Sequence, residues 1–378
     1  MSVCKQIHPL GARRARIMRR RVPSVARDLL DERPQALNKG MRVRNLWDWS
    51  KAKATAHAAA GPTMVRQDPG LWLQREEAIM GTAIRVELWC EDRERGEAAI
   101  DAVMAEMHRI DRTMSPHKSD SELARVNRDA FSAPVPLSGE MFVLLVQAQR
   151  FAQFSGGAFD ITYASVGHLY DYREGVAPDA AALERGRAAI GWRGLELDAR
   201  TRSVRFLREG MRIDLGGFAK GHAVDNAAAI LARHGIHHAH VAAGGDSRVI
   251  GDKRGRPWSI GERDPRRDGR LVAVLPLVDT AISTSGDYER FFERDGVRHH
   301  HIVDPATGRS PSSVHSVTVL AADGLTCEAL SKTVFVLGVE RGMPLVEATE
   351  GADAIVVDAA GQLHTSSGMS AGRTPARH

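Results

Sequence analysis

The sequence predicts an α+β fold with mixed or antiparallel sheets flanked by helices, and two patterns in its 378 residues support this. Stretches in which apolar and polar residues alternate, as in half-buried strands, follow one another along much of the chain. Amphipathic helical stretches, with apolar residues three and four positions apart, separate these strands in only a few places. A parallel sheet needs a crossover between successive strands, so the order of elements argues against a doubly wound fold.

The regular pattern of the first half begins at residues 82–89, where apolar residues alternate with charged ones. A helical stretch over residues 139–154 has Ser138 as its N-cap and Gly156-Gly157 as its stop signal. The elements expected in this half are a strand at 82–89, helices at 100–114, 139–154 and 221–234, and a hairpin that pairs 202–207 with 211–213.

Strands dominate the second half until a final helical region, which Gly338 divides in two because glycine favours helix ends. The elements expected here are strands at 239–243, 257–261, 270–277, 279–283, 298–303 and 314–321, helices at 325–337 and 340–349, and a hairpin that pairs 353–358 with 361–365. The length and composition of the chain allow one large domain or two intimately packed ones.

Charge divides the chain into three parts. Residues 1–70 hold 15 of the 52 Lys/Arg residues and 5 of the 47 Asp/Glu residues, so the other 308 hold 37 and 42 and are mildly acidic. We expect a basic, disordered extension over 1–75, a folded domain over 76–366 and a disordered tail over 367–378. A mildly acidic folded domain argues against nucleic-acid binding.

The basic extension has two further interpretations, a degenerate export signal or an anion-binding arm, and Met41 and Met64 are candidate translation starts. Its charged residues are not followed by the 7–15 apolar residues of a signal peptide, so the cytoplasm is the expected location. No run of 18 apolar residues occurs, which predicts no transmembrane segment. The three cysteines do not fit a disulfide framework or a zinc site.

The first candidate site is the glycine-rich segment Asp214-Leu-Gly-Gly-Phe-Ala-Lys-Gly221, which leads into a predicted helix. Its glycines let the backbone approach a ligand, the first N–H groups of the helix attract an anion, and Lys220 adds a charge suited to phosphate. A structural turn explains the segment equally well, and the pattern leaves both interpretations open. The segment does not contain the glycine-loop patterns typical of nucleotide-binding P-loops or dinucleotide folds.

Three consecutive histidines, at positions 299–301, form the second candidate site. In an extended strand His299 and His301 share one face and His300 takes the other. A metal site would need a further ligand that the local spacing does not supply. A general base is the better interpretation, because imidazole titrates near neutral pH.

Two other polar segments have simple structural interpretations. Asp246 and Arg248 follow a pair of glycines and are most simply a local ion pair. Glu328 and Lys332 are four residues apart in a predicted helix, with the acid first, which favours an ion pair on the helix surface. The alternative for the second pair is an acid and a cation that both face a site.

Taken together and in order, these segments resemble the FAD:protein FMN transferase family of ApbE-like flavin transferases over roughly residues 77–366. The motifs that carry the resemblance are Met80-Gly-Thr82, Gly157-Ala-Phe-Asp160-Ile-Thr162, Asp214–Asp225, Ala243-Gly-Gly-Asp246, Ser283-Thr-Ser-Gly286, His301-Ile-Val-Asp-Pro305 and Glu328-Ala-Leu-Ser331. The resemblance implies that FAD, the substrate, binds in a cleft between two closely packed subdomains. It also implies transfer of FMN to a threonine hydroxyl of an acceptor flavoprotein with release of AMP, assisted by Mg²⁺.

The resemblance also assigns roles to individual residues. It implies that His301 removes the threonine proton and that Lys220 provides catalytic positive charge. The residues that would line the FAD site are Met80, His117, Ala158, Phe159, Asp160, Asp214, Lys220 and Ile302, and the metal positions are Gly217, Glu328 and Lys332.

Two of the metal positions depart from the family pattern. Glu328 stands where the family usually has Asp, and Lys332 stands where it has Thr. A charged lysine cannot coordinate a metal ion. We therefore expect one of two outcomes: Lys332 supplies part of the positive charge and weakens metal dependence, or it pairs with Glu328 and leaves a slow or inactive enzyme.

Three alternatives to FMN transfer follow from the same residues. An FAD pyrophosphatase would give FMN and AMP with water as the acceptor, and a flavin carrier would bind FAD without turnover. Nucleic-acid binding through the basic residues 1–21 is the weakest alternative. Members of the resembled family are commonly exported and lipid-anchored, so a periplasmic or membrane-associated location is the alternative to the cytoplasm.

Overall fold

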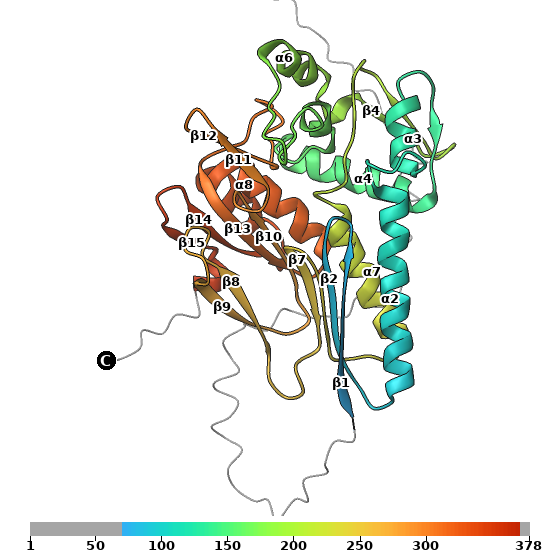
Figure 1. Ribbon diagram of the computed structural model, residues 1–378, viewed down its shortest axis with the longest axis vertical. Helices are drawn as coiled ribbons and strands as arrows, with labels where there is room; N and C mark the ends of the chain where they lie inside the picture. Colours follow the sequence, from blue (N-terminus) through green and yellow to red (C-terminus); the bar gives the residue numbers. More distant parts are fainter. Residues whose placement is uncertain (1–69, 371–378) are drawn as a thin grey trace, which may run out of the picture. The chain divides into compact units, whose positions relative to one another are not determined.

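The computed structural model describes residues 70–370, and its largest sheet has eight strands (Figure 1). Every hydrogen-bonded pair of strands in this sheet is antiparallel. In spatial order the strands are β1 (Leu71–Ile79), β2 (Thr82–Cys90), β6 (Ala239–Ala243), β7 (Asp246–Ile250), β10 (Ala281–Gly286), β13 (Val314–Ala321), β14 (Asp353–Asp358) and β15 (Leu363–Thr365). The predicted α+β fold class is confirmed.

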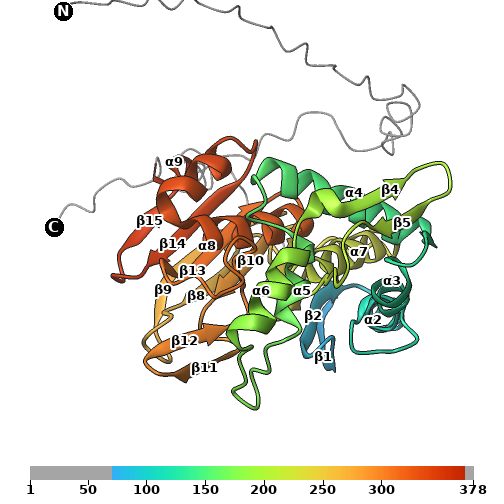
Figure 2. The same cartoon turned by 90° about the horizontal axis from the view of Figure 1, so that it is seen from above.

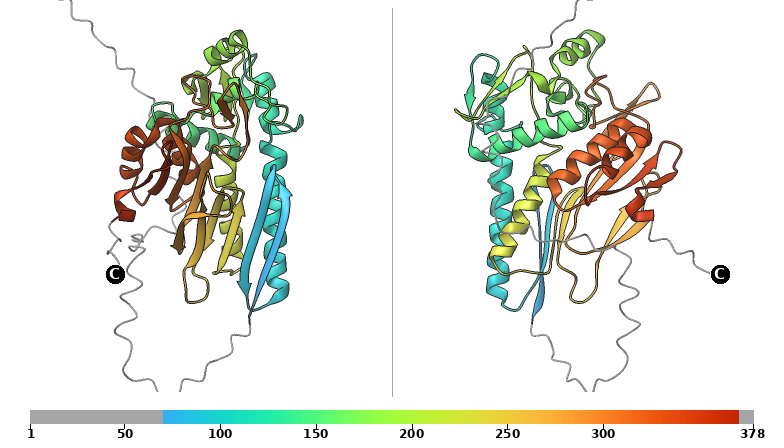
Figure 3. Two further views of the ribbon diagram at one scale, coloured as in Figure 1. Left: turned by 60° about the vertical axis from the view of Figure 1, so that its left-hand side comes forward. Right: turned by 180° about the vertical axis from the view of Figure 1, so that it is seen from behind.

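Three long helices cover one face of the sheet, as the right-hand view of Figure 3 shows. They are α2 (Arg93–Met114), α7 (Ala219–Arg233) and α8 (Gly324–Glu347). Apolar residues at helical spacing on α2, among them Ile100, Met107 and Ile110, are buried against β1, β2 and α7. Gly338 has φ 73° and interrupts α8, as predicted. Within the part of the chain that the structure describes, no helix has the length and apolar character needed to cross a bilayer.

A two-stranded hairpin, β8 (Trp258–Arg263) and β9 (Leu271–Leu277), packs against the other face. Its apolar residues Trp258, Leu275 and Leu277 pack on residues of the central strands, including Ile282 and Leu320. The short helix α9 (Ser367–Ser370) contacts β14. The sheet therefore has a helical layer on one face and a hairpin on the other.

The remaining elements lie above the upper end of the sheet in Figure 1, and Figure 2 shows them from above. They are α3 (Glu122–Asp129), β3 (Val135–Pro136), α4 (Gly139–Phe154), η2 (Ile161–Tyr163), α5 (Ala164–Gly167), α6 (Ala180–Ala189), η3 (Trp192–Gly194), β4 (Leu195–Asp198), β5 (Ser203–Phe206), β11 (Phe291–Arg294) and β12 (Val297–His300). All described residues belong to one compact unit. An FAD cleft between two subdomains therefore stays a prediction.

The predicted pairing of 202–207 with 211–213 is wrong. β5 instead pairs with the preceding strand β4, through a turn in which Arg202 has φ 48°. The backbone of Ile213 is held by a side chain, because Asn127 accepts from its N–H at 2.8 Å and donates to its carbonyl oxygen at 2.9 Å. A side chain thus takes the place of the expected strand partner.

Several strand boundaries also differ from those expected. β1 begins at Leu71, before the expected start of the folded domain at residue 76, and was not predicted because its charged residues obscure the alternation. β7 was missed because Gly244 and Gly245 form the tight turn that separates it from β6. The expected strand at 298–303 ends at His300. The extension over 1–69 and residues 371–378 lie outside the described residues.

A network of charged side chains connects α2, α4 and α7. Arg109 contacts the carboxylates of Glu106 and Glu140, each at 2.7 Å, and His222 Nε2 lies 2.8 Å from Glu140 Oε1. The hydrogen bond from His222, together with Arg109, lowers the pKa of Glu140 from 4.5 to about 2 despite its partial burial. A carboxyl group whose pKa is lower in the folded than in the unfolded state stabilises the fold at pH values above its unfolded-state pKa.

We expect the melting temperature to fall as the pH drops from about 4.5 towards 2, because Glu140 must then be protonated. The variant Glu140→Gln should melt at a lower temperature than the wild type at pH 7, and the difference should shrink across this pH range. The exposed Glu196→Gln is the control. Parallel melting curves for Glu140→Gln and the wild type at every pH would contradict the prediction.

Candidate functional site

A cluster of four charged side chains lies where α7, β7 and α8 meet. The Lys220 ammonium contacts the carboxylates of Asp246 and Glu328, with 2.6 Å between Lys220 Nζ and Glu328 Oε1. Lys332 lies one turn after Glu328, and its Nζ is 3.9 Å from the same oxygen. Asp246 and Glu328 are almost fully buried. We call Lys220, Asp246, Glu328 and Lys332 the charge cluster.

Two glycines let α7 and α8 approach closely enough to form the charge cluster. A Cβ atom on Gly221 would lie 2.4 Å from the carbonyl oxygen of Gly324, and one on Gly324 would lie 2.6 Å from the carbonyl oxygen of Gly221. Gly221 directly follows Lys220, while Gly324 lies one turn before Glu328 on the same helix face. This backbone contact therefore sets which faces of α7 and α8 meet, and on those faces Lys220 lies next to Glu328.

Three buried serines connect the charge cluster to the sheet. Ser283 Oγ donates to Asp246 Oδ1 at 2.6 Å, and Ser331 Oγ lies 3.0 Å from Ser283 Oγ and 2.9 Å from Ser285 Oγ. Hydrogen-bonded networks of buried groups fix the orientation of their members. The serines thus hold Asp246 in the orientation that meets Lys220.

Two interpretations made from the local sequence are wrong. Asp246 does not pair with Arg248, whose guanidinium lies 2.6 Å from Asp225 Oδ1. Glu328 and Lys332 do not form a pair on the helix surface, because Glu328 is fully buried and the Lys332 side chain is 17% exposed. Local spacing could not reveal either outcome, since Lys220 is 26 residues from Asp246 and 108 residues from Glu328.

Opposite charges within the cluster compensate for burial. Burial lowers the pKa of Lys220, but the charges of Asp246 and Glu328 outweigh it and raise that pKa. Burial also raises the pKa of Asp246, but the charges of Lys220 and Lys332, together with hydrogen bonds from Lys220 and Ser283, outweigh it and lower that pKa. Burial raises the pKa of Glu328 and lowers that of Lys332. The two carboxylates and two ammonium groups of the cluster sum to zero charge. Transfer of a proton from Lys332 to Glu328 would neutralise one group of each sign and leave that sum at zero.

Polar groups at the start of α7 and in the segment before it form hydrogen bonds with other parts of the chain. Asp214 accepts a hydrogen bond from the Tyr163 hydroxyl at 3.4 Å, which connects this segment to η2. The N–H of Gly221, in the first turn of α7, donates to Glu328 Oε2 at 2.8 Å. A donor at a helix N-terminus attracts an anion, and here the anion is a carboxylate of the same chain.

A strained turn approaches the histidine segment. Met80 and Gly81, with φ 54° and 69°, form the two-residue turn between β1 and β2. A methionine in the left-handed region costs energy, and such strain concentrates at binding sites. The Arg290 guanidinium donates to the Gly81 carbonyl oxygen at 3.0 Å. The backbone carbonyl oxygen of Arg290 accepts from the N–H of His301 at 3.1 Å. Arg290 thus connects the turn to His301.

The three histidines have different surroundings. His299 stacks on Phe292 with 4.9 Å between ring centroids, and buried His300 has its Nε2 2.8 Å from the Pro311 carbonyl oxygen. His301 lies after the end of β12, and its buried Nδ1 has no hydrogen-bond partner among residues 70–370. Burial, followed by the charge of Lys332, lowers the pKa of His301 to about 3. His301 is therefore unprotonated at neutral pH, the form that a general base requires.

The other residues implied by the resemblance differ in accessibility. Asp160 is buried and accepts from the N–H of Thr162 at 2.8 Å, so it caps η2. Phe159 packs on Phe218 with 5.3 Å between ring centroids, while Ala158 is half-buried. Ile302 is buried next to His301, and His117 is exposed on the loop after α2. Of the implied residues, the contacts bring together Gly217, Lys220, Glu328 and Lys332.

The residues at the implied metal positions do not fit a divalent cation as they stand. Both carboxylate oxygens of Glu328 already accept hydrogen bonds, from Lys220 and from the Gly221 N–H. The Lys332 side chain lies against Gly217, with its Cε 3.3 Å from where a Cβ on Gly217 would be. Within residues 70–370, no group of three or more His, Cys, Asp or Glu side chains could hold a metal ion.

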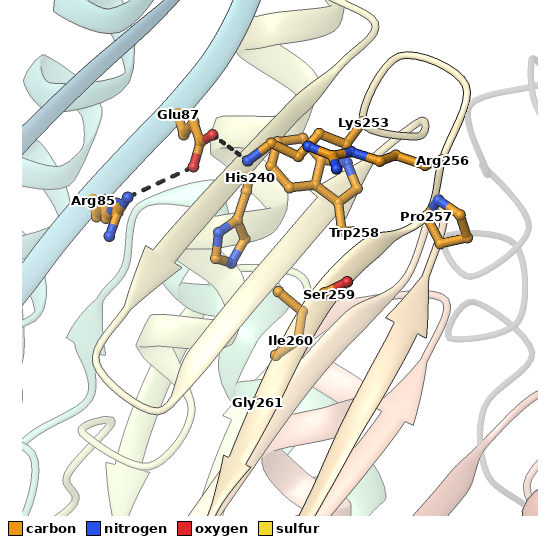
Figure 4. A pocket seen from close by; sticks show the side chains of 10 residues that line it. All are labelled: Arg85, Glu87, His240, Lys253, Arg256, Pro257, Trp258, Ser259, Ile260 and Gly261. Carbon is orange, nitrogen blue, oxygen red and sulfur yellow. Dashed lines mark hydrogen bonds and ion pairs between the residues drawn. The ribbon is translucent and has the colours of Figure 1, made fainter. Parts of the chain in front are cut away.

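A separate cavity of about 490 Å³ lies on the other face of the sheet, between β2, β6 and β8 (Figure 4). Glu87 points away from the helical layer and contacts Lys253 at 2.6 Å and Arg85 at 3.6 Å. Neither the charge cluster nor His301 lines this cavity. It is therefore distinct from the candidate site.

Fold and site together define an antiparallel α+β protein with a buried lysine–carboxylate cluster at the N-terminus of a helix. The ApbE family model matches residues 80–356, so the chain belongs to the ApbE family.

Relatives and solved structures agree with this assignment. The chain is 34% identical over 315 residues to a Treponema pallidum protein named FAD:protein FMN transferase, with 78% of this chain and 87% of that protein covered. A Vibrio cholerae protein of the same name is 36% identical over 261 residues, with 67% and 77% covered. The ApbE protein of Thermotoga maritima has a similar structure, with a TM-score of 0.75, 32% identity and 81% and 100% of the two chains covered. For the flavin transferase ApbE from Vibrio cholerae the TM-score is 0.71 at 30% identity, with 80% and 99% covered.

Proposed function

We propose that this protein transfers FMN from FAD to a threonine hydroxyl of an acceptor flavoprotein, with release of AMP. The observation that carries the proposal is the charge cluster with unprotonated His301 within reach of its lysine charges, in a chain of the ApbE family. Relatives that cover most of this chain are named for the same activity. Transfer of a phosphoryl-type group depends mainly on positioning and on stabilisation of charge, which a fixed cluster of this kind provides.

His301 acts as the general base in this proposal. The threonine oxygen forms a bond to the phosphorus of the FMN half, the phosphorus–oxygen bond to AMP breaks, and the threonine proton passes to His301. A threonine hydroxyl is a weak nucleophile at neutral pH and requires such a base. Burial, which lowers the pKa of His301 to about 3, leaves its imidazole unprotonated at neutral pH and also makes it a weaker base than an exposed histidine.

The remaining residues hold FAD. We infer that the strained turn at Met80, the backbone at Ala158 and Phe159, and the side chains of Asp214 and Ile302 line the flavin and diphosphate. Glycine turns and helix N-termini are typical of sites that approach a diphosphate closely. Asp160 is assigned a supporting role, because its carboxylate is already used within the chain. Exposed His117 lies at the rim in this proposal.

The resemblance also implies Mg²⁺, but no step of this proposal involves it, because the residues at the implied positions do not fit a divalent ion. The cytoplasm stays the predicted location, with the periplasm as the alternative. The division into an extension over 1–75, a catalytic domain over 76–366 and a disordered tail over 367–378 also stays a prediction, with two departures: β1 begins at Leu71, and Ser367–Ser370 form the helix α9.

Mass spectrometry of a candidate acceptor tests the proposed function. Incubation of the acceptor with this protein and FAD should add one FMN, less water, to a threonine-containing peptide and should release AMP in equal amount. An acceptor in which that threonine is replaced by valine should stay unmodified. Free FMN formed at the same rate with and without acceptor would instead indicate a pyrophosphatase. Bound but intact FAD would indicate a flavin carrier.

A further inference from the structure

Lys332 occupies the position at which the family pattern places a metal ligand, and the structure shows what its ammonium does there. The side chain lies against Gly217, and Nζ is 3.9 Å from Glu328 Oε1. These are the positions that the resemblance assigns to the metal. A lysine ammonium is therefore located among them.

Both oxygens of Glu328 already accept hydrogen bonds within the chain. Its Oε1 is 2.6 Å from Lys220 Nζ, and its Oε2 accepts from the Gly221 N–H at 2.8 Å. Mg²⁺ requires six oxygen ligands in near-octahedral geometry. A divalent ion bound to Oε1 of Glu328 would therefore lie next to two ammonium groups, since Lys220 Nζ is 2.6 Å and Lys332 Nζ is 3.9 Å from that oxygen.

The charge balance of the buried cluster leads to the same conclusion. Two carboxylates, Asp246 and Glu328, face two ammonium groups, Lys220 and Lys332, so the cluster is neutral as it stands. In the protein without FAD, a divalent cation would add two positive charges to a region that burial has removed from water. Uncompensated buried charge is strongly unfavourable.

We propose that the Lys332 ammonium is the resident cation of this site and that the protein binds and cleaves FAD without a divalent ion there. The inference rests on the proposed function and extends it to the choice of cation. In this arrangement Lys332 donates hydrogen bonds to the diphosphate, and its charge stabilises the negative charge that develops on the departing AMP. The bonds made and broken are those of the proposed transfer, and no further reactant is needed.

Two measurements test this proposal. Binding of Mn²⁺, followed by electron paramagnetic resonance, reports on the metal site without turnover. The rate of FAD cleavage in EDTA reports on the need for metal. Both are made on the full chain with the wild type, Lys332→Thr, Lys332→Met and Lys332→Arg. Lys253→Thr, which changes a lysine on the other face of the sheet, is the matched control.

The wild type and Lys253→Thr should bind no Mn²⁺ at this site, and EDTA should change their rates by less than about twofold. Lys332→Thr should gain one Mn²⁺ site, and EDTA should slow it on the order of 10²-fold, a typical loss when one charge-stabilising group is removed. Lys332→Met should be slow with and without metal, and Lys332→Arg should remain insensitive to EDTA. Melting curves identify any variant that fails to fold, and in that case Mn²⁺ binding by the wild type and its rate in EDTA decide the proposal.

Three results would overturn the proposal. They are binding of Mn²⁺ at this site by the wild type, a wild-type rate that EDTA lowers as much as that of Lys332→Thr, and a Lys332→Met variant as fast as the wild type in EDTA. If no variant cleaves FAD with any acceptor, the proposed function fails. The Mn²⁺ measurement still decides the identity of the resident cation in that case.

Discussion

Replacement of His301 by asparagine should slow FMN transfer by roughly 10²–10⁴-fold, the range typical of loss of a general base. Asparagine retains a polar side chain but cannot accept the threonine proton. Binding of FAD, followed by quenching of flavin fluorescence, should change little, because the base acts on the acceptor hydroxyl. Single-turnover transfer followed by mass spectrometry measures the rate.

The substitution His299→Asn, two residues before His301, is the control. His299 stacks on Phe292, and its variant should transfer FMN at close to the wild-type rate. The pH profile gives a second check. Because the pKa of His301 is about 3, protonation of this residue should not lower kcat/KM for FAD between pH 7 and pH 5. A His301→Asn variant as fast as the wild type would show that another group removes the proton.

Replacement of Glu328 by alanine should destabilise the protein by about 3–5 kcal/mol, because it breaks a buried ion pair and leaves charge without a partner. Lys220 keeps Asp246, but Lys332 loses its nearest carboxylate, and the Gly221 N–H loses its acceptor. Urea unfolding measures the change in the free energy of unfolding. If the alanine variant does not fold, Glu328→Gln tests the same loss of charge with the shape preserved.

Glu340→Ala, at an exposed position of the same helix, is the matched control and should change the free energy of unfolding by no more than about 0.5 kcal/mol. Equal unfolding midpoints for Glu328→Ala and Glu340→Ala would mean that the cluster does not stabilise the fold. Activity should fall with Glu328→Ala as well, since Lys220 and Lys332 would no longer be held in place.

Local patterns in the sequence were sufficient for much of the fold. A strand-like run predicted β13, the N-cap Ser138 predicted the start of α4, and Gly338 predicted the break in α8. The β4–β5 hairpin was not predicted, because residues 202–207 were expected to pair with 211–213 instead. The deciding contact was the side chain of Asn127, which is 86 residues from Ile213.

The site was harder to predict than the fold, because its contacts join distant segments. Family motifs indicated Lys220, Glu328 and His301, but not that Asp246 is a partner of Lys220 or that Arg290 connects the Met80 turn to His301. Burial of Glu328 and Lys332 also depends on the packing of α7 against α8. Spacing within one helix cannot distinguish a buried pair from a solvated one.

The contact between Gly221 and Gly324 limits how the two helices can vary. Each residue of an α-helix turns the following side chains by about 100°. A single residue inserted between Gly324 and Glu328 would therefore rotate the carboxylate away from α7, even if every cluster residue were retained. Insertions and deletions are tolerable only where they do not rotate α7 and α8 relative to each other, for example in the loop at 234–238 that follows α7.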